Sequence, residues 1–299
     1  MKNSVILFSL LLAFNLSFAQ NLKPYILAFE STESISAVKE KVSANLKANN
    51  IYPVGQYQPA NDKGRWVIVF TSPELKKSVK TVGGLTGFAA TLRVALTTEN
   101  GKTVVSYTNP TYWGNAYFQD NYEKVKGNYS TLSTHLITAM KASGSFIGTE
   151  FGSKKGLSIK DLRSYHYMMG MPYFEDSVEL EDFDSHAAAI AKIDASVKKG
   201  IPNVKLVYKV TIPGKNLTLY GFALSGENGE AQFMPIIDQG TPKHTAFLPY
   251  EVLVKDDEVH ILHGRFRIAI AFPDLTMGTF SKIMSTPGNI EEMLEKLVD

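Results

Sequence analysis

One pattern of helix, strands and hairpin occurs twice in this chain, and it constrains the fold more than any local motif. Residues 90–107 (ATLRVALTTENGKTVVSY) read as strand, tight turn and strand, and residues 246–263 (AFLPYEVLVKDDEVHILH) read the same way without a gap. Patterns that recur in the same order at one offset indicate a duplicated α/β unit. Upstream of the two hairpins, apolar residues recur at helical spacing, namely Ile35, Val38 and Val42 in the first half and Ile190, Ile193 and Val197 in the second.

The first nineteen residues carry the features of an export signal. Lys2 precedes an apolar run at residues 5–14, and Ser17-Phe18-Ala19 places small residues where a signal peptidase reads them. The run is about half of the roughly 20 residues needed to span a bilayer. We therefore expect a signal peptide at residues 1–19, cleavage before Gln20, and a periplasmic or secreted protein without a membrane span.

Composition excludes several classes of protein. The chain has no cysteine, which removes disulfides, thiolate nucleophiles, cysteine metal ligands and a lipid-modified N-terminus. Hydrophobic residues make up 44% and charged residues 20%, as in soluble globular proteins. The net charge of +2 and the lack of Lys/Arg-rich runs argue against a nucleic-acid partner.

The first unit is predicted at residues 20–143. Asn100-Gly101 is a strong hairpin signal, and Ser72-Pro73 is a capped helix start with proline in the first turn. We expect strands at 25–30, 52–58 and 66–71, helices ending near 50, 82 and 142, and a polar-aromatic loop at 109–121. The strand at 66–71 (WVIVFT) is apolar on both faces, which predicts a central place in the sheet.

A linker is predicted at residues 144–160, where glycines and lysines concentrate, and the second unit at 161–299. The first strand of this unit is ambiguous, because residues 165–174 and 178–183 both compete for it. An irregular stretch at 225–245 stands in place of the second helix, and a closing helix is expected at about 279–297.

Several stretches of the chain resemble one known family. The second half contains LPYEVLV, a strand and GRFRIAIAFPDLTMGTF, and the first half contains WVIVFTSPEL and a hairpin with VVSYTNP. Together they resemble the domain of unknown function 302 family, in two tandem copies that cover most of the mature chain. The resemblance implies an α+β fold of two similar two-layer sandwiches, each with an antiparallel-rich sheet packed against helices. It brings no reaction, no cofactor and no catalytic residues.

Familiar catalytic signatures are absent from the sequence. There is no G-x-S-x-G, H-E-x-x-H, P-loop or G-x-G-x-x-G motif. The cluster HYMMGM at 166–171 contains histidine and thioether ligands that suit soft copper. On a strand, however, His166 and Met168 would face away from Met169 and Met171, which favours core packing. The aromatic residues at 112–118 similarly suit either a flat ligand or the sealing of a sheet end.

The preferred candidate binding site is a row of basic side chains near the end of the second unit. If residues 259–272 form a strand, His263, Arg265 and Arg267 share one face at about 6.6 Å spacing and can converge on an anion. Lys243 and His244, from the irregular stretch, could add to this site. The alternatives are a solvated sheet face, or structural ion pairs with Glu251 and Asp238.

The leading functional interpretation is an exported protein that binds a small ligand, an anionic one among the candidates, or a protein partner, and that has no catalytic machinery of its own. One alternative is an extracytoplasmic hydrolase that uses histidines and Asp238 of the second unit. The other is a metal or haem carrier built on His166 and its methionines. The sequence names no cofactor.

Overall fold

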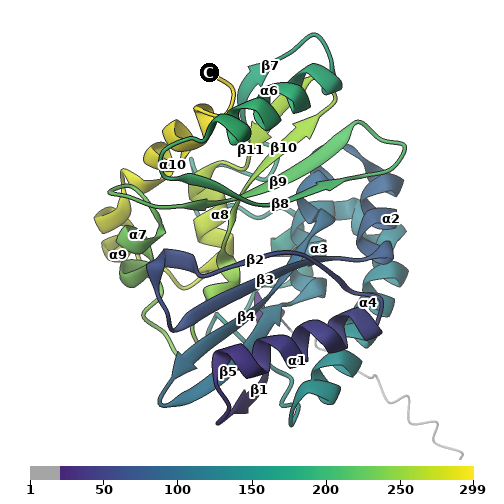
Figure 1. Cartoon of the computed structure of the whole chain (residues 1–299), viewed down its shortest axis with the longest axis vertical. Helices are drawn as coiled ribbons and strands as arrows, with labels where there is room; N and C mark the ends of the chain where they lie inside the picture. Colours follow the sequence, from purple (N-terminus) through teal and green to yellow (C-terminus); the bar gives the residue numbers. More distant parts are fainter. Residues whose placement is uncertain (1–20) are drawn as a thin grey trace, which may run out of the picture.

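A computed structural model describes residues 21–299 of the chain. The described part contains two sheets and helices packed against them, an α+β architecture (Figure 1). The predicted signal peptide, residues 1–19, lies outside the described residues. Within 21–299, no helix combines the length and apolar character needed to cross a membrane.

The first half of the described chain runs from β1 to α5. Its elements, with 3-10 helices labelled η, are β1 (Tyr25–Ser31), α1 (Ile35–Ala48), β2 (Tyr52–Tyr57), η1 (Pro59–Asn61), β3 (Arg65–Thr71), α2 (Pro73–Val82), η2 (Gly84–Ala90), β4 (Leu92–Glu99), β5 (Lys102–Thr108), α3 (Pro110–Phe118), η3 (Gln119–Asn121), α4 (Tyr122–Ser143), β6 (Thr149–Phe151) and α5 (Ile159–Arg163).

The second half runs from β7 to α10. Its elements are β7 (Val178–Asp182), α6 (His186–Lys199), β8 (Val204–Thr211), β9 (Leu217–Leu224), α7 (Glu230–Ile237), η4 (Thr245–Phe247), β10 (Tyr250–Lys255), β11 (Glu258–Ile261), α8 (Gly264–Ala271), α9 (Met277–Phe280), η5 (Ser281–Ile283) and α10 (Thr286–Glu295).

The two sheets have the same strand order when strands are matched by their place along the chain. The first sheet runs β2-β3-β4-β5-β1, with β6 added at the edge, and the second runs β8-β9-β10-β11-β7. All strand pairs are antiparallel. The predicted two-layer architecture with antiparallel sheets is confirmed. The central hairpins also turn alike, since Asn100 and Asp256 both have positive φ, at 50° and 55°.

Local sequence explains where the helices begin. Ser34, Ser72 and Ser185 accept hydrogen bonds from backbone N–H groups three residues on, as N-caps do. Helix α1 then buries Val38, Val42 and Leu46, its predicted apolar stripe. Figure 1 shows α1 and α4 together on one face of the first sheet. The other face meets the second unit, so β3 is buried on both faces as its apolar sequence predicts.

In each unit, the short segment before the central hairpin packs against the sheet of the other unit. Segment η2 packs on β9 and β10, and η4 packs on β3, β4 and β5. Edge strands β2 and β8 also run side by side (Figure 1). Their contact is close, because a Cβ on Gly55 would lie 2.4 Å from the Val207 carbonyl oxygen. The junction between the units is therefore an interior, not a loosely wetted boundary.

Replacing Gly55 with alanine is expected to lower the free energy of unfolding by about 1–3 kcal/mol, since the methyl group forces β2 away from β8. Gly127→Ala provides the control. Gly127 lies inside α4 with nothing within 4 Å, so alanine there should raise stability by about 0.5–1 kcal/mol. Urea unfolding of both variants checks this, and similar effects of the two would show that the units do not press together at Gly55.

Two predicted irregular segments are helical. The polar-aromatic loop at 109–121 contains α3, which begins where Asn109 caps the Thr111 N–H at 3.2 Å and Pro110 occupies the first turn. The stretch at 225–245 contains α7, in the place that α2 has in the first unit. Glycines before α7 and Pro235 within it hide its helical pattern, although Phe233, Met234 and Ile237 give it a buried face.

The segments around the unit boundary also differ from prediction. The linker at 144–160 contains β6, whose Phe151 pairs with Tyr25 of β1, so the first sheet extends into it. Of the two candidate first strands of the second unit, residues 178–182 form β7, whereas 165–174 form no strand. The HYMMGM cluster at 166–171 therefore lies outside any strand. The expected alternation of its side chains between two sheet faces is not present.

Candidate functional site

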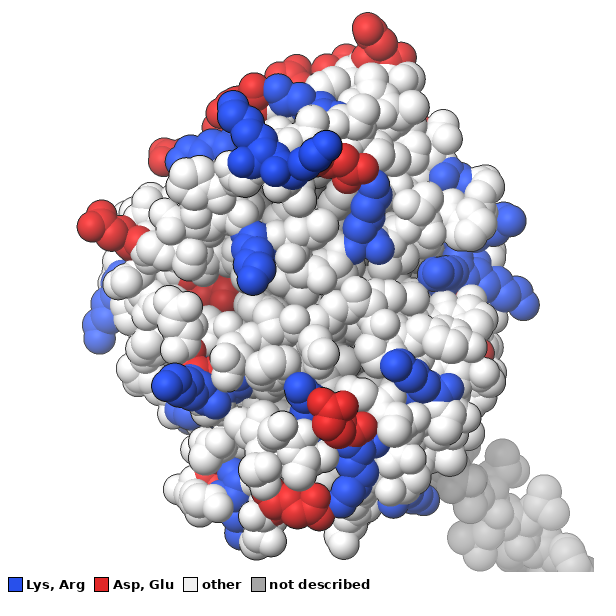
Figure 2. All heavy atoms as spheres, in the orientation of Figure 1, with Lys and Arg blue, Asp and Glu red and all other residues white. Residues whose placement is uncertain are grey.

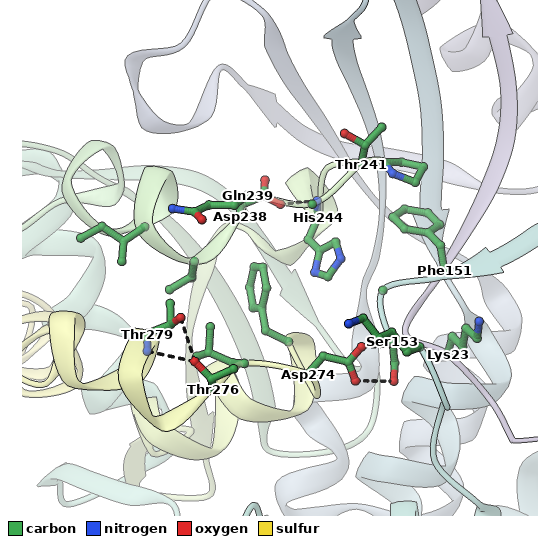
Figure 3. Close-up of a pocket in the computed structure, with 18 of the residues that line it drawn as sticks. Lys23, Phe151, Ser153, Asp238, Gln239, Thr241, His244, Asp274, Thr276 and Thr279 are labelled. Carbon is green, nitrogen blue, oxygen red and sulfur yellow. Dashed lines mark hydrogen bonds between the residues drawn. The ribbon is translucent and has the colours of Figure 1, made fainter.

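A cavity of about 450 Å³ opens between the two units (Figure 3). The first unit contributes Lys23 and the end of β6 with the following turn, residues 150–154. The second contributes the loop after α7, residues 238–242 and His244, and the segment from α8 to α9. This volume lies in the range of small-molecule sites.

His244 stands in the centre of the cavity wall, pointing from the α7 loop toward the α8–α9 segment in Figure 3. Its ring packs against Tyr25 and Phe151 of the first unit and Phe272 of the second, with centroid distances of 4.9, 5.8 and 4.7 Å. Burial lowers the pKa of His244, and the Asp238 carboxylate opposes this shift. The ring is therefore neutral near pH 7 and presents an aromatic surface rather than a cation.

Asp238 fixes the loop that carries His244. It is 3% exposed, accepts the backbone N–H of His244 at 2.8 Å, and forms an ion pair with Arg65 of β3. Arg65 also donates to Thr245 at 3.0 Å. An arginine of the first unit thus holds the cavity-lining loop of the second. Asp238 contacts the backbone of His244 and not its ring, so the two do not form the acid–imidazole pair of a hydrolase.

In the opposite wall of the cavity, Asp274 of the second unit is hydrogen-bonded to the first unit. Its carboxylate accepts from Ser153 Oγ at 2.9 Å and from the Lys154 N–H at 2.5 Å. Thr276 and Thr279 continue this wall with their hydroxyls 3.1 Å apart. Apolar lining comes from Phe151, Ile236, Ile237, Pro242, Phe272 and Leu275. The cavity therefore offers both apolar walls and polar groups that could orient a ligand.

The predicted basic row is not on one sheet face, because β11 ends at Ile261 and residues 264–271 form helix α8. His263 is the N-cap of α8 and accepts the Arg265 N–H at 3.2 Å. Arg265 is exposed, whereas Arg267 is 2% exposed and lies 3.5 Å from Glu251. The strand geometry was wrong because the alternating apolar residues belong to a helix buried on nearly all sides. Arg267 has one of the structural ion pairs considered as the alternative.

Lys243 and His244 are neighbours in the chain but face different surroundings. Lys243 donates from Nζ to the Asp238 carbonyl at 3.0 Å and from its backbone N–H to Glu99 at 3.0 Å. Of the five predicted binding residues, only His244 lines the cavity. Sequence analysis missed the other wall residues, because Asp274 and Ser153 come together only when the units dock.

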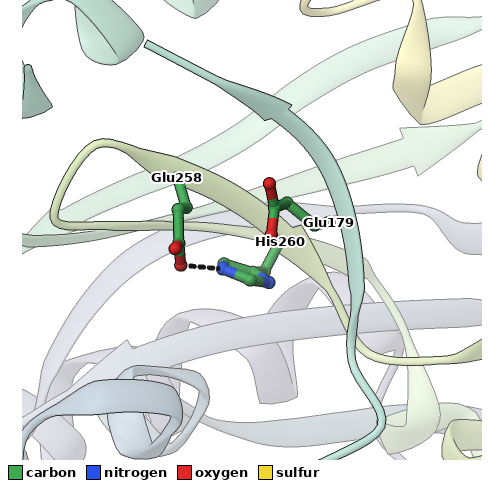
Figure 4. A group of neighbouring side chains, drawn as sticks. All are labelled: Glu179, Glu258 and His260. Carbon is green, nitrogen blue, oxygen red and sulfur yellow. Dashed lines mark hydrogen bonds and ion pairs between the residues drawn. The ribbon is translucent and has the colours of Figure 1, made fainter. Parts of the chain in front are cut away.

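A second cluster of ionisable groups lies at the outer end of the second sheet. Glu179 of β7 pairs in register with His260 of β11, and Glu258 lies beside them, with ligand atoms within 4.8 Å of one another (Figure 4). Glu258 already has two partners, since His260 Nε2 lies 2.8 Å from its carboxylate and Lys255 forms an ion pair with the same carboxylate. His166, on which the alternative metal-carrier interpretation rested, is not part of this group.

Comparison with solved structures gives a weak structural likeness. No family model matches the chain, and no curated protein does. A crystal structure of an uncharacterized conserved protein DUF302 from Bacillus stearothermophilus is similar at a TM-score of 0.35 and 14% identity. That similarity covers 40% of this chain and 98% of the other.

Proposed function

We propose that the protein binds a small molecule in the cavity between its units. The observation that supports this most is the convergence of wall segments from both units on one hollow of about 450 Å³ that mixes aromatic and polar lining. Such a site is complete only in the assembled two-unit protein, which gives the docking of the units a function.

The charges around the cavity favour a neutral or zwitterionic ligand over a strongly anionic one. Lys23 and Lys154 are matched by Glu150 and Asp274, while Asp238 is neutralised by Arg65. Figure 2 shows basic and acidic side chains interspersed over the face of the molecule drawn there. A small ligand with a flat apolar part against Phe272 and hydrogen-bonding groups toward Thr276 and Asp274 fits this lining best.

Gly240 offers a way to close the cavity without disturbing the fold. It lines the cavity, and a Cβ there would meet nothing within 4 Å. A thermal-shift screen with small aromatic and zwitterionic metabolites should find compounds that raise the Tm of the wild type, and Gly240→Phe should abolish the shift. Gly288→Phe, at an equally open glycine of α10, should keep it. If hits stabilise the Gly240→Phe variant as much as wild type, the cavity is not the binding site.

We also propose that the chain carries two copies of one α+β unit and is exported. The common strand order of the two sheets supports duplication, and the sequence of residues 1–19 supports export. Protein recovered from the medium or periplasm should have a mass that corresponds to a first residue of Gln20. An intact Met1 in that fraction would contradict export with cleavage.

A further inference from the structure

One buried cluster at the junction between the units holds two arginines and a single carboxylate. Arg93 of β4, Arg267 of α8 and Glu251 of β10 meet there, with exposed fractions of 4%, 2% and 2%. Both arginines contact the same carboxylate, through Arg93 Nη2 on Glu251 Oε1 and Arg267 Nη2 3.5 Å from Oε2. Two buried guanidinium groups thus share one counterion, and buried charges are normally fully paired.

Other side chains already hydrogen-bond to one oxygen of the Glu251 carboxylate. Tyr208 donates its hydroxyl to Glu251 Oε1 at 2.6 Å, and Thr91 approaches the same oxygen at 3.4 Å. Among the described residues, Oε2 receives no hydrogen bond. Oε1 of Glu251 thus has contacts from Arg93, Tyr208 and Thr91, and the single charge of this carboxylate is shared by two arginines.

Arg267 uses its hydrogen-bond donors elsewhere. Its Nη2 donates to the carbonyls of Phe247 and Pro249 at 2.9 and 2.6 Å, which consumes both hydrogens of that nitrogen. The guanidinium also lies over the rings of Phe247 and Tyr250, 4.8 and 5.0 Å from their centroids. The contact with Glu251 is therefore electrostatic only, and the charge of Arg267 is incompletely balanced.

Several buried donors beside this cluster have no acceptor in the described part of the chain. They are Nε of Arg93, Nε of Arg267 and the hydroxyls of Tyr25 and Tyr250. The phenol of Tyr117 is also near these charges: burial and Glu251 raise its pKa to about 12, although Arg267 and Arg93 act to lower it. A buried donor left unsatisfied costs free energy comparable to a lost hydrogen bond. These four donors outnumber the free carboxylate oxygen of the cluster, Oε2 of Glu251, and this points to a missing acceptor.

We propose that this cluster binds one small monovalent inorganic anion of the size of chloride, beside the guanidinium groups of Arg93 and Arg267. A single negative charge matches the excess of two arginines over one glutamate. A halide accepts several N–H and O–H donors at once and needs little space, which suits surroundings that are almost fully buried. Neither arginine nor Glu251 lines the cavity assigned to the small-molecule ligand, so the two sites can be tested separately.

Thermal unfolding in sodium bromide, chloride and fluoride at constant ionic strength tests the site in solution. The Tm of the wild type should be about 5 °C higher in bromide than in fluoride. The reason is that an anion that binds only the folded state stabilises that state. Arg93→Met leaves one arginine for one glutamate and should lose this difference. Arg265→Met removes an exposed arginine of the same helix as Arg267 and should keep it.

Crystals of the wild type grown in bromide locate the anion independently of any variant. We expect one anomalous peak within about 3.5 Å of nitrogen atoms of both Arg93 and Arg267. Absence of a peak there means that water fills the site, and it overturns the proposal even if Arg93→Met fails to fold. Equal bromide effects on wild type and Arg93→Met would also overturn it. Neither result bears on binding in the cavity.

Discussion

Replacing Glu251 with alanine is expected to lower the free energy of unfolding by about 3–5 kcal/mol. The change leaves Arg93 and Arg267 buried at 4% and 2% exposure without their shared carboxylate, and breaking a buried ion pair by removing one partner costs about this much. It also takes the acceptor from the Tyr208 hydroxyl, which is buried between the units. Because these contacts cross the junction, the loss should be shared by both units in one transition.

Urea unfolding followed by circular dichroism and by tryptophan fluorescence measures this loss. Glu30→Ala is the matched control, since Glu30 forms an exposed ion pair with Lys102 and such pairs contribute at most about 1 kcal/mol. A loss below about 1 kcal/mol in Glu251→Ala would mean that water reaches the arginines and that the junction is not a sealed interior.

Strands and hairpins were predictable because their signals are local. Asn100-Gly101 marks a tight turn, and the apolar run at 66–71 marks a strand covered on both faces, which the structure confirms. The helix starts at Ser34 and Ser72 are equally local, since each cap needs only a side chain and a backbone N–H three residues away. Such features do not depend on the rest of the fold.

Helix α8 shows why the predicted site failed. Phe266, Ile268 and Ile270 alternate as in a strand, but the whole segment is buried except Arg265, so no polar face reveals the helical period. A buried helix and a buried strand then have the same composition. The signal that was available is the polar residue His263 before Gly264, which caps α8 as Asn109 caps α3.

The charge clusters could not be predicted from a single sequence. Arg93 and Glu251 stand 158 positions apart, and Arg65 and Asp238 stand 173 apart. Each pair joins a strand or helix end of one unit to the other, so it exists only because the units dock through η2 and η4. The sequence indicates two units but contains no local sign of how they face each other.

The stability of the protein should fall as pH rises from about 4.5 to about 7, because of Glu230. This residue begins α7, is 1% exposed, and accepts from the Tyr57 hydroxyl and the Ala60 N–H of the first unit, both at 2.9 Å. Burial raises its pKa from 4.5 to about 7, although those donors and the Leu224 N–H oppose the shift. The folded protein thus binds a proton in this range that the unfolded chain has lost, and deprotonation favours unfolding.

The expected contribution of Glu230 is about 3 kcal/mol between pH 4.5 and pH 8, at 1.36 kcal/mol for each unit of pKa difference. Glu230→Gln cannot titrate, so the stability difference between wild type and this variant should change by that amount over the range. Glu227→Gln, an exposed neighbour, should follow wild type at every pH. Urea unfolding at half-unit pH steps provides the test. If the difference between wild type and Glu230→Gln stays constant with pH, the carboxylate is ionised throughout, and its three donors outweigh the cost of burying it.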